Sequence, residues 1–237
     1  MVTELCHLLQ PDLKPQTRTA LSVIVNITIV LNFYTNGSFQ GATGDISNTF
    51  LFAVHCSISK VTDALYRKRR DYISFPMSRE KQHKCACDIA RIVGFPMVQG
   101  AIDCTHVALQ APLHNPEIFC NHKAYHSLNV QLVCDHTRGI LTVNARYPGS
   151  SHDAFILRQT GVPALFQPPN GARCWLLADK RYLLSTWLMF PLRNPTTPTQ
   201  HSYNESYAAT RNIIEQAIGV LKQWFRCLDR SGGGLQY

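Results

Sequence analysis

Acidic residues inside or beside apolar segments are the first candidates for chemistry in this chain. Asp103 lies within Gly100–Pro112, where mostly small or apolar residues indicate a short buried strand. Asp179 ends the apolar run Cys174–Asp179, and Glu215 lies on a long helical pattern. A buried carboxylate is costly unless a hydrogen-bond network, a basic side chain or a metal ion compensates it. All three compensations remain open for Asp103.

Asp153, a further acidic residue, and Glu215 both have ordinary structural explanations. Asp153 lies in the first turn of a predicted helix, where negative charge is favoured, and Ser151 is the predicted N-cap. Capping alone would therefore account for Asp153. Glu215 follows Arg211 by one helical turn, so an ion pair along the helix would account for that acid.

The order of the predicted elements places the acids in a common framework. After the Asp103 strand come a hairpin, a helix, the Asp179 strand and a final helix. The hairpin is formed by Ser127–Asp135 and Ile140–Tyr147, and the two helices by Ala154–Gln159 and Tyr203–Arg226. This order matches the RNase H-like α/β fold, a mixed sheet flanked by helices that brings acids from the first strand, the fourth strand and a following helix to one point.

Three carboxylates at one point require a cation to stay ionised together. Two divalent ions bridged by Asp103, Asp179 and Glu215 would activate water and stabilise the leaving oxygen of a phosphodiester. Mg²⁺ and Mn²⁺ suit ligation by oxygen alone. The predicted chemistry is therefore phosphodiester hydrolysis.

Residues 1–75 have mainly helical patterns. We expect helices over Glu4–Gln10, ended by Pro11, over Thr17–Tyr34 and over Ser57–Arg70, with a turn at Gly41–Asp45. This succession is compatible with a helix-turn-helix DNA reader. Its basic end, Arg67–Arg70, is either a solvated helix terminus or a patch that contacts phosphates. Residues 76–94 are charged and predict an irregular connector, in which Ser78–Lys81 could start a helix.

Composition limits the remaining function classes. The chain has 237 residues and a net charge of +8, which suits a polyanionic partner without requiring one. Its nine cysteines include no Cys-x-x-Cys pair, so reduced thiols are expected and a structural zinc site is disfavoured. The longest apolar run, Leu21–Tyr34, is shorter than the ~18 residues of a membrane span and contains asparagines. No signal peptide or membrane association is expected.

Several motifs in one order resemble the PIF/Harbinger transposases and the nucleases derived from them. The resemblance is strong over 95–237 and weak before it, and the matching segments are Asp103–His106, Tyr147–Asp153, Ala178–Tyr182, Pro191–Pro195, Asn212–Glu215 and Gly219–Lys222. It implies a DDE nuclease core in which Asp103, Asp179 and Glu215 are catalytic metal ligands and Asp153 is a fourth ligand. It also implies Mg²⁺ or Mn²⁺, DNA as substrate, action in the nucleus and also the cytoplasm, and a Myb-like partner protein.

The chain departs from that family pattern in three places. Asp179-Lys-Arg181-Tyr stands where the family usually has Asp-x-Gly-Tyr, so Arg181 could distort a turn beside a ligand. The segment Phe50–Cys56 is mostly apolar where relatives carry polar readers of DNA. The chain stops at Gly234–Tyr237 where relatives continue with further helix, so we expect a C-terminally truncated domain.

The sequence therefore predicts a helix-turn-helix-like region at 1–75, a connector at 76–94 and a nuclease domain at 95–237. The predicted function is metal-dependent hydrolysis of DNA. The alternative is an inactive transposase-derived module that binds DNA or protein. The oligomeric state and the DNA target stay open.

Overall fold

The computed structural model describes residues 2–14, 20–37, 40–166, 174–182 and 185–230. The chain forms two compact units. The first comprises Met1–Tyr72, Ala108–Gln110 and Lys222–Tyr237, and the second comprises Ile73–Val107 and Ala111–Leu221. Whether the boundaries predicted from the sequence separate independently folding domains stays a prediction.

The first unit is helical. Its elements are α1 (Val2–Leu13), α2 (Val23–Asn36), α3 (Gln40–Ser47), α4 (Leu51–Arg67), α5 (Arg69–Tyr72) and the short 3-10 helix η1 (Arg226–Leu228). Its core forms where apolar side chains of α1, α2 and α4 pack together, namely Leu9, Leu13, Ile27, Val30, Val61 and Ala64. The helical character predicted for this region is therefore confirmed, whereas a helix-turn-helix stays a prediction.

Several predictions in this unit were wrong. Helix α2 begins at Val23, whereas the predicted start at Thr17 lies outside the described residues, and α4 begins at Leu51 rather than at Ser57.

Pro11 lies inside α1, because the helix continues for two residues to the buried side chain of Leu13. Proline lacks the backbone N–H that would bond to the carbonyl four residues earlier, so α1 loses one hydrogen bond at Pro11 but continues past it. Helix α3 replaces the predicted turn at Gly41–Asp45, and Thr43 and Gly44 are buried within it. Local turn composition was thus overridden by tertiary packing.

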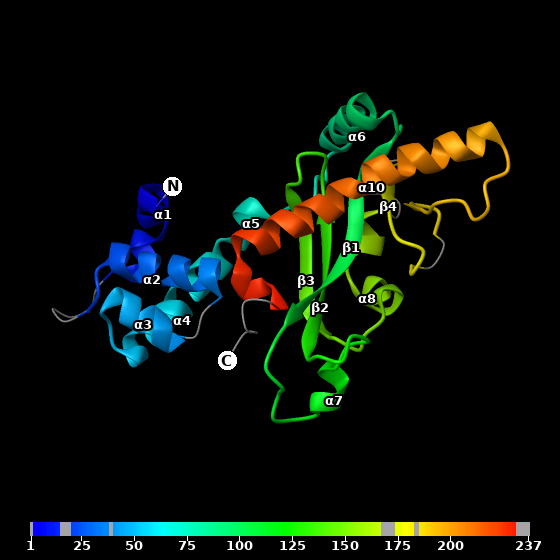
Figure 1. Cartoon of the computed structure of the whole chain (residues 1–237). Helices are drawn as coiled ribbons and strands as arrows, with labels where there is room; N and C mark the ends of the chain where they lie inside the picture. Colours follow the sequence, from blue (N-terminus) through cyan, green and yellow to red (C-terminus); the bar gives the residue numbers. More distant parts are fainter. Residues whose placement is uncertain (1, 15–19, 38–39, 167–173, 183–184, 231–237) are drawn as a thin grey trace. The chain divides into compact units, whose positions relative to one another are not determined.

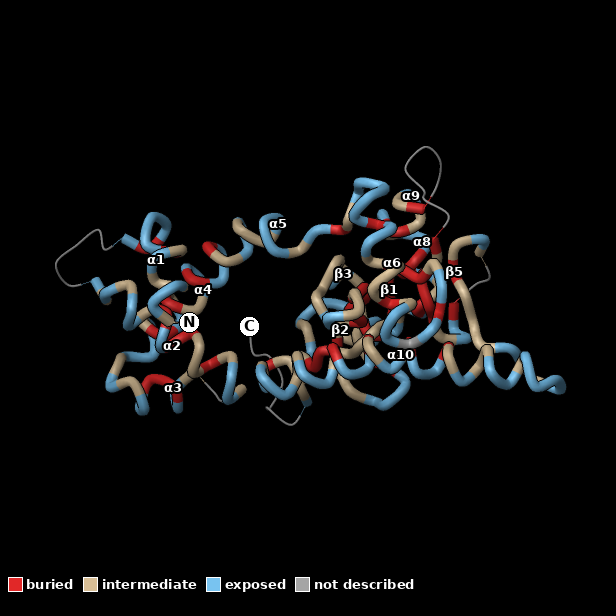
Figure 2. The backbone as a smooth tube through the Cα atoms, turned by 90° about the horizontal axis from the view of Figure 1, so that it is seen from above, coloured by how far each residue is buried: buried red, intermediate tan, exposed pale blue. Residues whose placement is uncertain are grey.

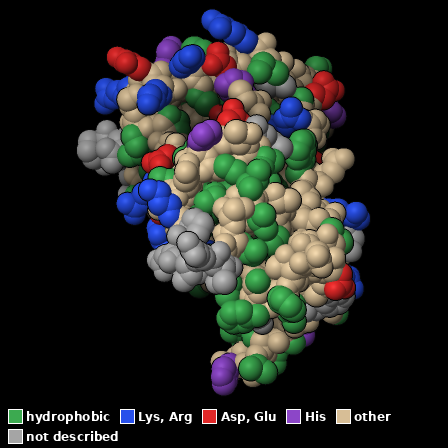
Figure 3. Space-filling view, turned by 90° about the vertical axis from the view of Figure 1, so that its left-hand side faces the viewer, with side chains coloured by type: hydrophobic (Ala, Val, Ile, Leu, Met, Phe, Trp, Pro, Cys, Tyr) green, Lys and Arg blue, Asp and Glu red, His purple; other side chains and the backbone are tan. Residues whose placement is uncertain are grey.

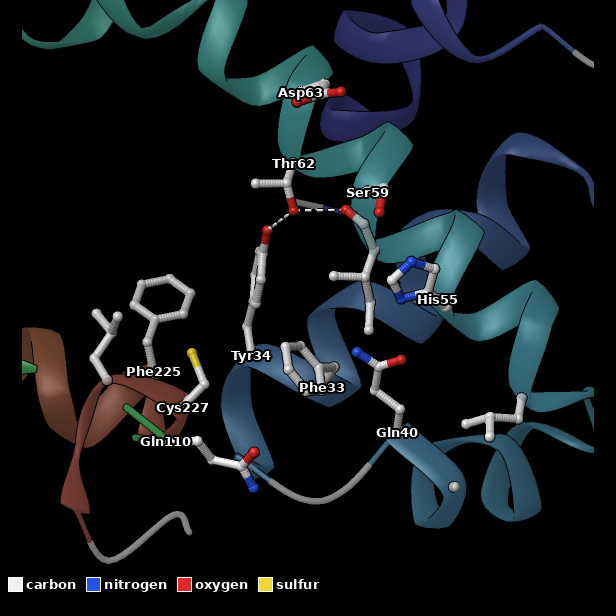
Figure 4. Close-up of a pocket in the computed structure, with 14 residues that line it drawn as sticks. Phe33, Tyr34, Gln40, His55, Ser59, Thr62, Asp63, Gln110, Phe225 and Cys227 are labelled. Atoms are coloured by element: carbon white, nitrogen blue, oxygen red, sulfur yellow. Dashed lines mark hydrogen bonds between the residues drawn. The ribbon is translucent and has the colours of Figure 1, made fainter. Parts of the chain in front are cut away.

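A cavity of about 1020 Å³ lies within the helical unit (Figure 4). Phe33 and Tyr34 of α2, His55 and Thr62 of α4, and Phe225 contribute to its lining. The hydroxyl groups of Tyr34 and Thr62 are 2.5 Å apart and join the two helices at its wall. The cavity therefore combines an aromatic lining with a few hydroxyl groups.

The second unit is built on a five-stranded mixed sheet, which confirms the predicted α/β class. The strands are β1 (Val98–Ala108), β2 (Ser127–Cys134), β3 (Ile140–Pro148), β4 (Trp175–Leu177) and β5 (Leu188–Met189), in the spatial order β3-β2-β1-β4-β5. Strands β2 and β3 pair antiparallel, as the hairpin prediction required. Strand β4 pairs parallel with both β1 and β5.

Helices lie on both faces of this sheet. Figures 1 and 2 place α10 (Pro198–Trp224) along one face and α8 (Asp153–Gln159) on the other. On the α8 side, Ile102, Val133, Leu157 and Leu176 belong to one buried cluster. The remaining helices are α6 (Arg79–Val93), α7 (Pro116–Phe119) and α9 (Val162–Leu165).

Helix α6 corrects the prediction of an irregular connector over 76–94. The side chain of Ser78 caps the helix by accepting a hydrogen bond from the Lys81 amide, and Gly94 ends the helix at a positive φ of 72°. Buried Ala86 and Ile89 give α6 a packed side despite its charged sequence. Strand β5 and helices α7 and α9 were not predicted.

Surface features add two observations. No helix in the described part of the chain is long and apolar enough to cross a membrane. Figure 3 shows hydrophobic side chains exposed at the surface. The exposed hydrophobic residues include Phe50 and Phe52, whose surfaces are 89% and 78% exposed.

Candidate active site

The register of the two central parallel strands brings Asp103 and Asp179 together. Ala101 of β1 pairs with Leu177 of β4, and each acid lies two residues further along its own strand direction. Side chains two residues apart on a strand share a face, and parallel neighbours keep the same direction. Asp103 and Asp179 are therefore positioned side by side by the sheet.

Helix α10 completes the group by placing Arg211 among the acids. The Nη2 atom of Arg211 is 2.8 Å from Oδ2 of Asp103 and 3.8 Å from Oδ2 of Asp179. Its Nη1 atom is 2.5 Å from Oε1 of Glu215. The hydroxyl of Tyr207 donates a hydrogen bond to the carbonyl of Ala178 and holds α10 against the end of β4. The three predicted catalytic acids thus surround one guanidinium.

Asp153 lies at the start of α8 and is 7% exposed. Its Oδ1 accepts a hydrogen bond of 2.9 Å from Nδ2 of Asn129 on β2. Its Oδ2 is 3.4 Å from Nη1 of Arg181. The N-cap residue of α8 is His152, without a side-chain capping bond, so the predicted cap at Ser151 was wrong.

Arg181 connects Asp153 to the rest of the acids. Its Nε atom is 3.5 Å from Oδ2 of Asp179, while its Nη1 atom contacts Asp153. Asp179 is therefore shared between Arg181 and Arg211. The structure brings together all four acids named from the sequence through contacts with these two arginines.

Burial is the largest influence on the pKa of Asp103. It raises the pKa of Asp103 above its ordinary value, although Arg211 and the Cys104 amide oppose the rise, and Asp153 and Asp179 add to it. Burial works to lower the pKa of Arg211, but Asp103, Asp179 and Glu215 outweigh it and raise that pKa. Asp103 is therefore a carboxyl group that needs a nearby cation to remain ionised.

The donor set fits an oxygen-preferring divalent cation, because every acid contributes carboxylate oxygens and three already share one positive group. With Arg211 in their midst, no three Asp, Glu, His or Cys side chains in the described ranges have the arrangement of a metal site. Ligation of a metal would therefore require these carboxylates to exchange arginine contacts for metal contacts.

Sequence reasoning identified the acids but missed the reach of both arginines. The ion pair predicted between Arg211 and Glu215 is present, yet Arg211 also contacts Asp103 across the fold. The signal for Arg181 was its place beside Asp179 in a motif that usually carries glycine. Sequence spacing does not reveal that its guanidinium reaches Asp153.

Comparisons with known proteins identify the family of the chain. Residues 102–236 match the family described as DDE superfamily endonuclease. The Bos taurus and Homo sapiens proteins named "Putative nuclease HARBI1" are each 36% identical over 222 residues, covering 94% of this chain and 64% of the relative. The Arabidopsis thaliana "Protein ALP1-like" is 23% identical over 193 residues, covering 73% of this chain and 47% of the relative.

The chain thus spans 64% of the length of the first two relatives. No solved structure matches it. The family match contains Asp103, Asp153, Asp179 and Glu215, and it also contains both arginines that contact them. On this evidence the chain belongs to the DDE superfamily endonucleases and, among them, to the PIF/Harbinger transposase family.

Proposed function

We propose that this chain is a divalent-metal-dependent nuclease of transposase descent with an RNase H-like core that hydrolyses DNA phosphodiester bonds. The observation that carries the proposal is the convergence of Asp103, Asp179 and Glu215 on one cation, Arg211, within a DDE endonuclease match. Acids from β1, from the end of β4 and from α10 meet there, as a shared cation site requires.

Each acid has a distinct part in the proposed mechanism. Asp103 and Asp179, fixed by adjacent strands, form the rigid side of the metal site, and Glu215 approaches from α10 with a side chain that is 53% exposed. Asp153 adds a buried fourth carboxylate. Bound Mg²⁺ or Mn²⁺ would activate water and offset charge on the leaving oxygen. The carboxylates would hold and orient the metal ions, and they form no covalent bond to DNA.

Arg67–Arg70 is the proposed contact with DNA phosphates. Arg67 and Lys68 pair with Asp12 at 3.3 and 3.7 Å, and the Arg69 guanidinium lies 3.8 Å from the Tyr66 ring centre. The Arg67 side chain is 66% exposed, so exchange of Asp12 for a phosphate costs little burial.

We also propose that a partner protein supplies sequence specificity. The start of α4 is apolar and exposed at Phe50, Leu51 and Phe52, so it offers few groups that could read base edges. The family resemblance favours a Myb-like DNA-binding partner and action in the nucleus, with the cytoplasm as a further location.

Plasmid nicking tests the proposed nuclease. The full chain should nick supercoiled DNA with Mg²⁺ or Mn²⁺, lose that activity in EDTA, and lose it with Asp103→Ala. Arg193→Ala is the matched control, because Arg193 is exposed on a loop of the same unit and has no assigned role. Nicking that survives both EDTA and Asp103→Ala would exclude the mechanism.

An inactive module that binds DNA or protein is the second candidate function. It is favoured by the two arginines that already neutralise part of the acidic group. That candidate would be supported if purified chain bound duplex DNA but showed no metal-dependent nicking and no Mn²⁺ binding that Asp103→Ala removes.

A further inference from the structure

Arg181 gives this acidic site an unusual cation. Its guanidinium lies between Asp153 and Asp179, with nitrogen–oxygen distances of 3.4 and 3.5 Å. The other arginine, Arg211, serves Asp103, Asp179 and Glu215. Arg181 thus supplies a cation to Asp153, the acid of these four that Arg211 does not contact in the described residues, and it links Asp153 to Asp179.

The turn that follows β4 fixes Arg181 in this position. The amide of Tyr182 donates to the carbonyl of Asp179 at 3.1 Å. The Tyr182 ring is buried, and its hydroxyl lies 3.2 Å from the Cys104 sulfur on β1. A side chain at position 181 is therefore carried beside Asp179 by an anchored turn.

Burial differs sharply across the Arg181–Asp153 pair. The Asp153 side chain is 7% exposed, whereas the Arg181 side chain is 64% exposed. A buried carboxylate requires a partner, but a largely exposed arginine can move into water at small cost. Arg181 can therefore move away from Asp153 when a cation of higher charge binds that carboxylate.

We infer that Arg181 is a resident counter-ion that competes with a divalent metal ion for the carboxylates of Asp153 and Asp179. This inference rests on the proposed function, since it assumes that the acids bind metal. When all groups are ionised, four carboxylates (−4) and two guanidiniums (+2) leave a net charge of −2. One divalent ion balances that charge, so binding of a second is opposed while Arg181 stays in place.

Calorimetric titration of Mn²⁺ into the metal-free full chain tests the inference. Arg181→Gly and Arg181→Gln should each bind Mn²⁺ about two- to fivefold more tightly than the unmodified chain, the upper part of the range expected for an exposed ion pair. Lys180→Gln is the matched control, because Lys180 is an exposed positive residue in the same turn without a contact to Asp153. Its effect should be smaller than that of Arg181→Gln.

Thermal unfolding gives a second readout that does not depend on activity. In EDTA, Arg181→Gln should lower the melting temperature because Asp153 loses its cation, and Mn²⁺ should raise that temperature more than it does in the unmodified chain. Equal Mn²⁺ affinities for Arg181→Gln, Lys180→Gln and the unmodified chain would overturn the inference and leave the proposed function standing. Mn²⁺ binding that Asp103→Ala does not weaken in any variant would overturn both.

Discussion

Arg211 contacts acidic residues from more elements than its position on a helix suggests. A guanidinium offers several donors in a fixed plane, so one side chain can serve carboxylates that approach from different elements. Here those carboxylates come from β1, the end of β4 and α10. Without a metal ion, Arg211 is the cation that allows these acids to lie close together.

We predict that Arg211→Met destabilises the metal-free protein. Its side chain and that of Asp103 are 20% and 14% exposed, so the substitution leaves a nearly buried carboxylate without its cation. The free energy of unfolding should fall by about 2 kcal/mol, below the loss for a fully buried pair because some solvent reaches both groups. Urea unfolding in EDTA measures this loss.

Arg193→Met is the control for that measurement, because Arg193 is exposed in the same unit. It should change the unfolding free energy by about 0.5 kcal/mol or less. Added Mn²⁺ should restore part of the stability lost in Arg211→Met. Equal losses in the two variants would show that Arg211 has no special role in compensating the acids.

Asp153→Asn separates a ligand from a merely structural acid. Asparagine is similar in size to aspartate, but its amide is a weaker ligand for a divalent ion. We predict weaker Mn²⁺ binding, with a stability change of about 1 kcal/mol or less because the contact with Arg181 is largely exposed on the arginine side. Calorimetric titration and urea unfolding measure the two effects, and unchanged Mn²⁺ affinity would remove Asp153 from the ligand set.

The length and polarity pattern of each helix or strand decided whether it could be predicted from the sequence. The hairpin of β2 and β3 was predictable because its strands alternate in polarity around the tight turn Thr137–Gly139. Strand β5 has only two residues, Leu188 and Met189, and such a length carries no periodicity. The start of α6 was predicted as a possibility at Ser78–Lys81, but its continuation to Val93 was missed because its charged composition obscures the spacing of Ala86 and Ile89.

The candidate site also has a part that could be predicted from the sequence and a part that could not. Element order was enough to group Asp103, Asp179 and Glu215, because strand register and helix position follow from topology. The long-range contact between Arg211 and Asp103 could not be predicted, since it depends on how α10 packs against the sheet. Contacts between side chains of separate elements are tertiary information that spacing along one element does not contain.

Gly149 tests how closely the turn before Asp153 is packed. A Cβ atom at this position would lie 2.3 Å from the Ser127 hydroxyl oxygen and 2.5 Å from the Phe119 carbonyl oxygen. Gly149→Ala must therefore shift backbone, and we predict a loss of about 1–3 kcal/mol in unfolding free energy. Mn²⁺ affinity should fall with it, because the same turn leads into Asp153.

The control for this substitution is Gly161→Ala, where an added Cβ has no neighbour within 4 Å and φ is −74°. Chemical unfolding should show a change of about 0.5 kcal/mol or less for the control. If Gly149→Ala were as harmless as Gly161→Ala, the turn would be loose enough to adapt, and the tight packing around Asp153 would be refuted.

At the scale of the whole molecule, positive charge dominates the expected encounter with DNA. The net charge of +8 attracts a polyanion over a long range, but it distinguishes no base sequence. The apolar start of α4 supplies few side chains suited to base edges, with His55 and Cys56 as the only polar or weakly polar residues in Phe50–Cys56. Binding by the chain alone should therefore rely on phosphates.

We predict weak sequence preference and strong salt dependence for the isolated chain. Each phosphate contact contributes about −0.9 to the slope of log K against log salt concentration. Replacing both Arg69 and Arg70 with alanine should therefore reduce the steepness of that slope by about 2 if both contact phosphates. Arg193→Ala should leave the slope nearly unchanged, because Arg193 is an exposed arginine outside the basic run.

Titrations on random duplexes and on candidate terminal repeats at several salt concentrations measure both quantities. A large preference for the repeats that persists at high salt would show that the helical unit reads bases by itself. An unchanged slope in the double variant would exclude Arg69 and Arg70 as phosphate contacts.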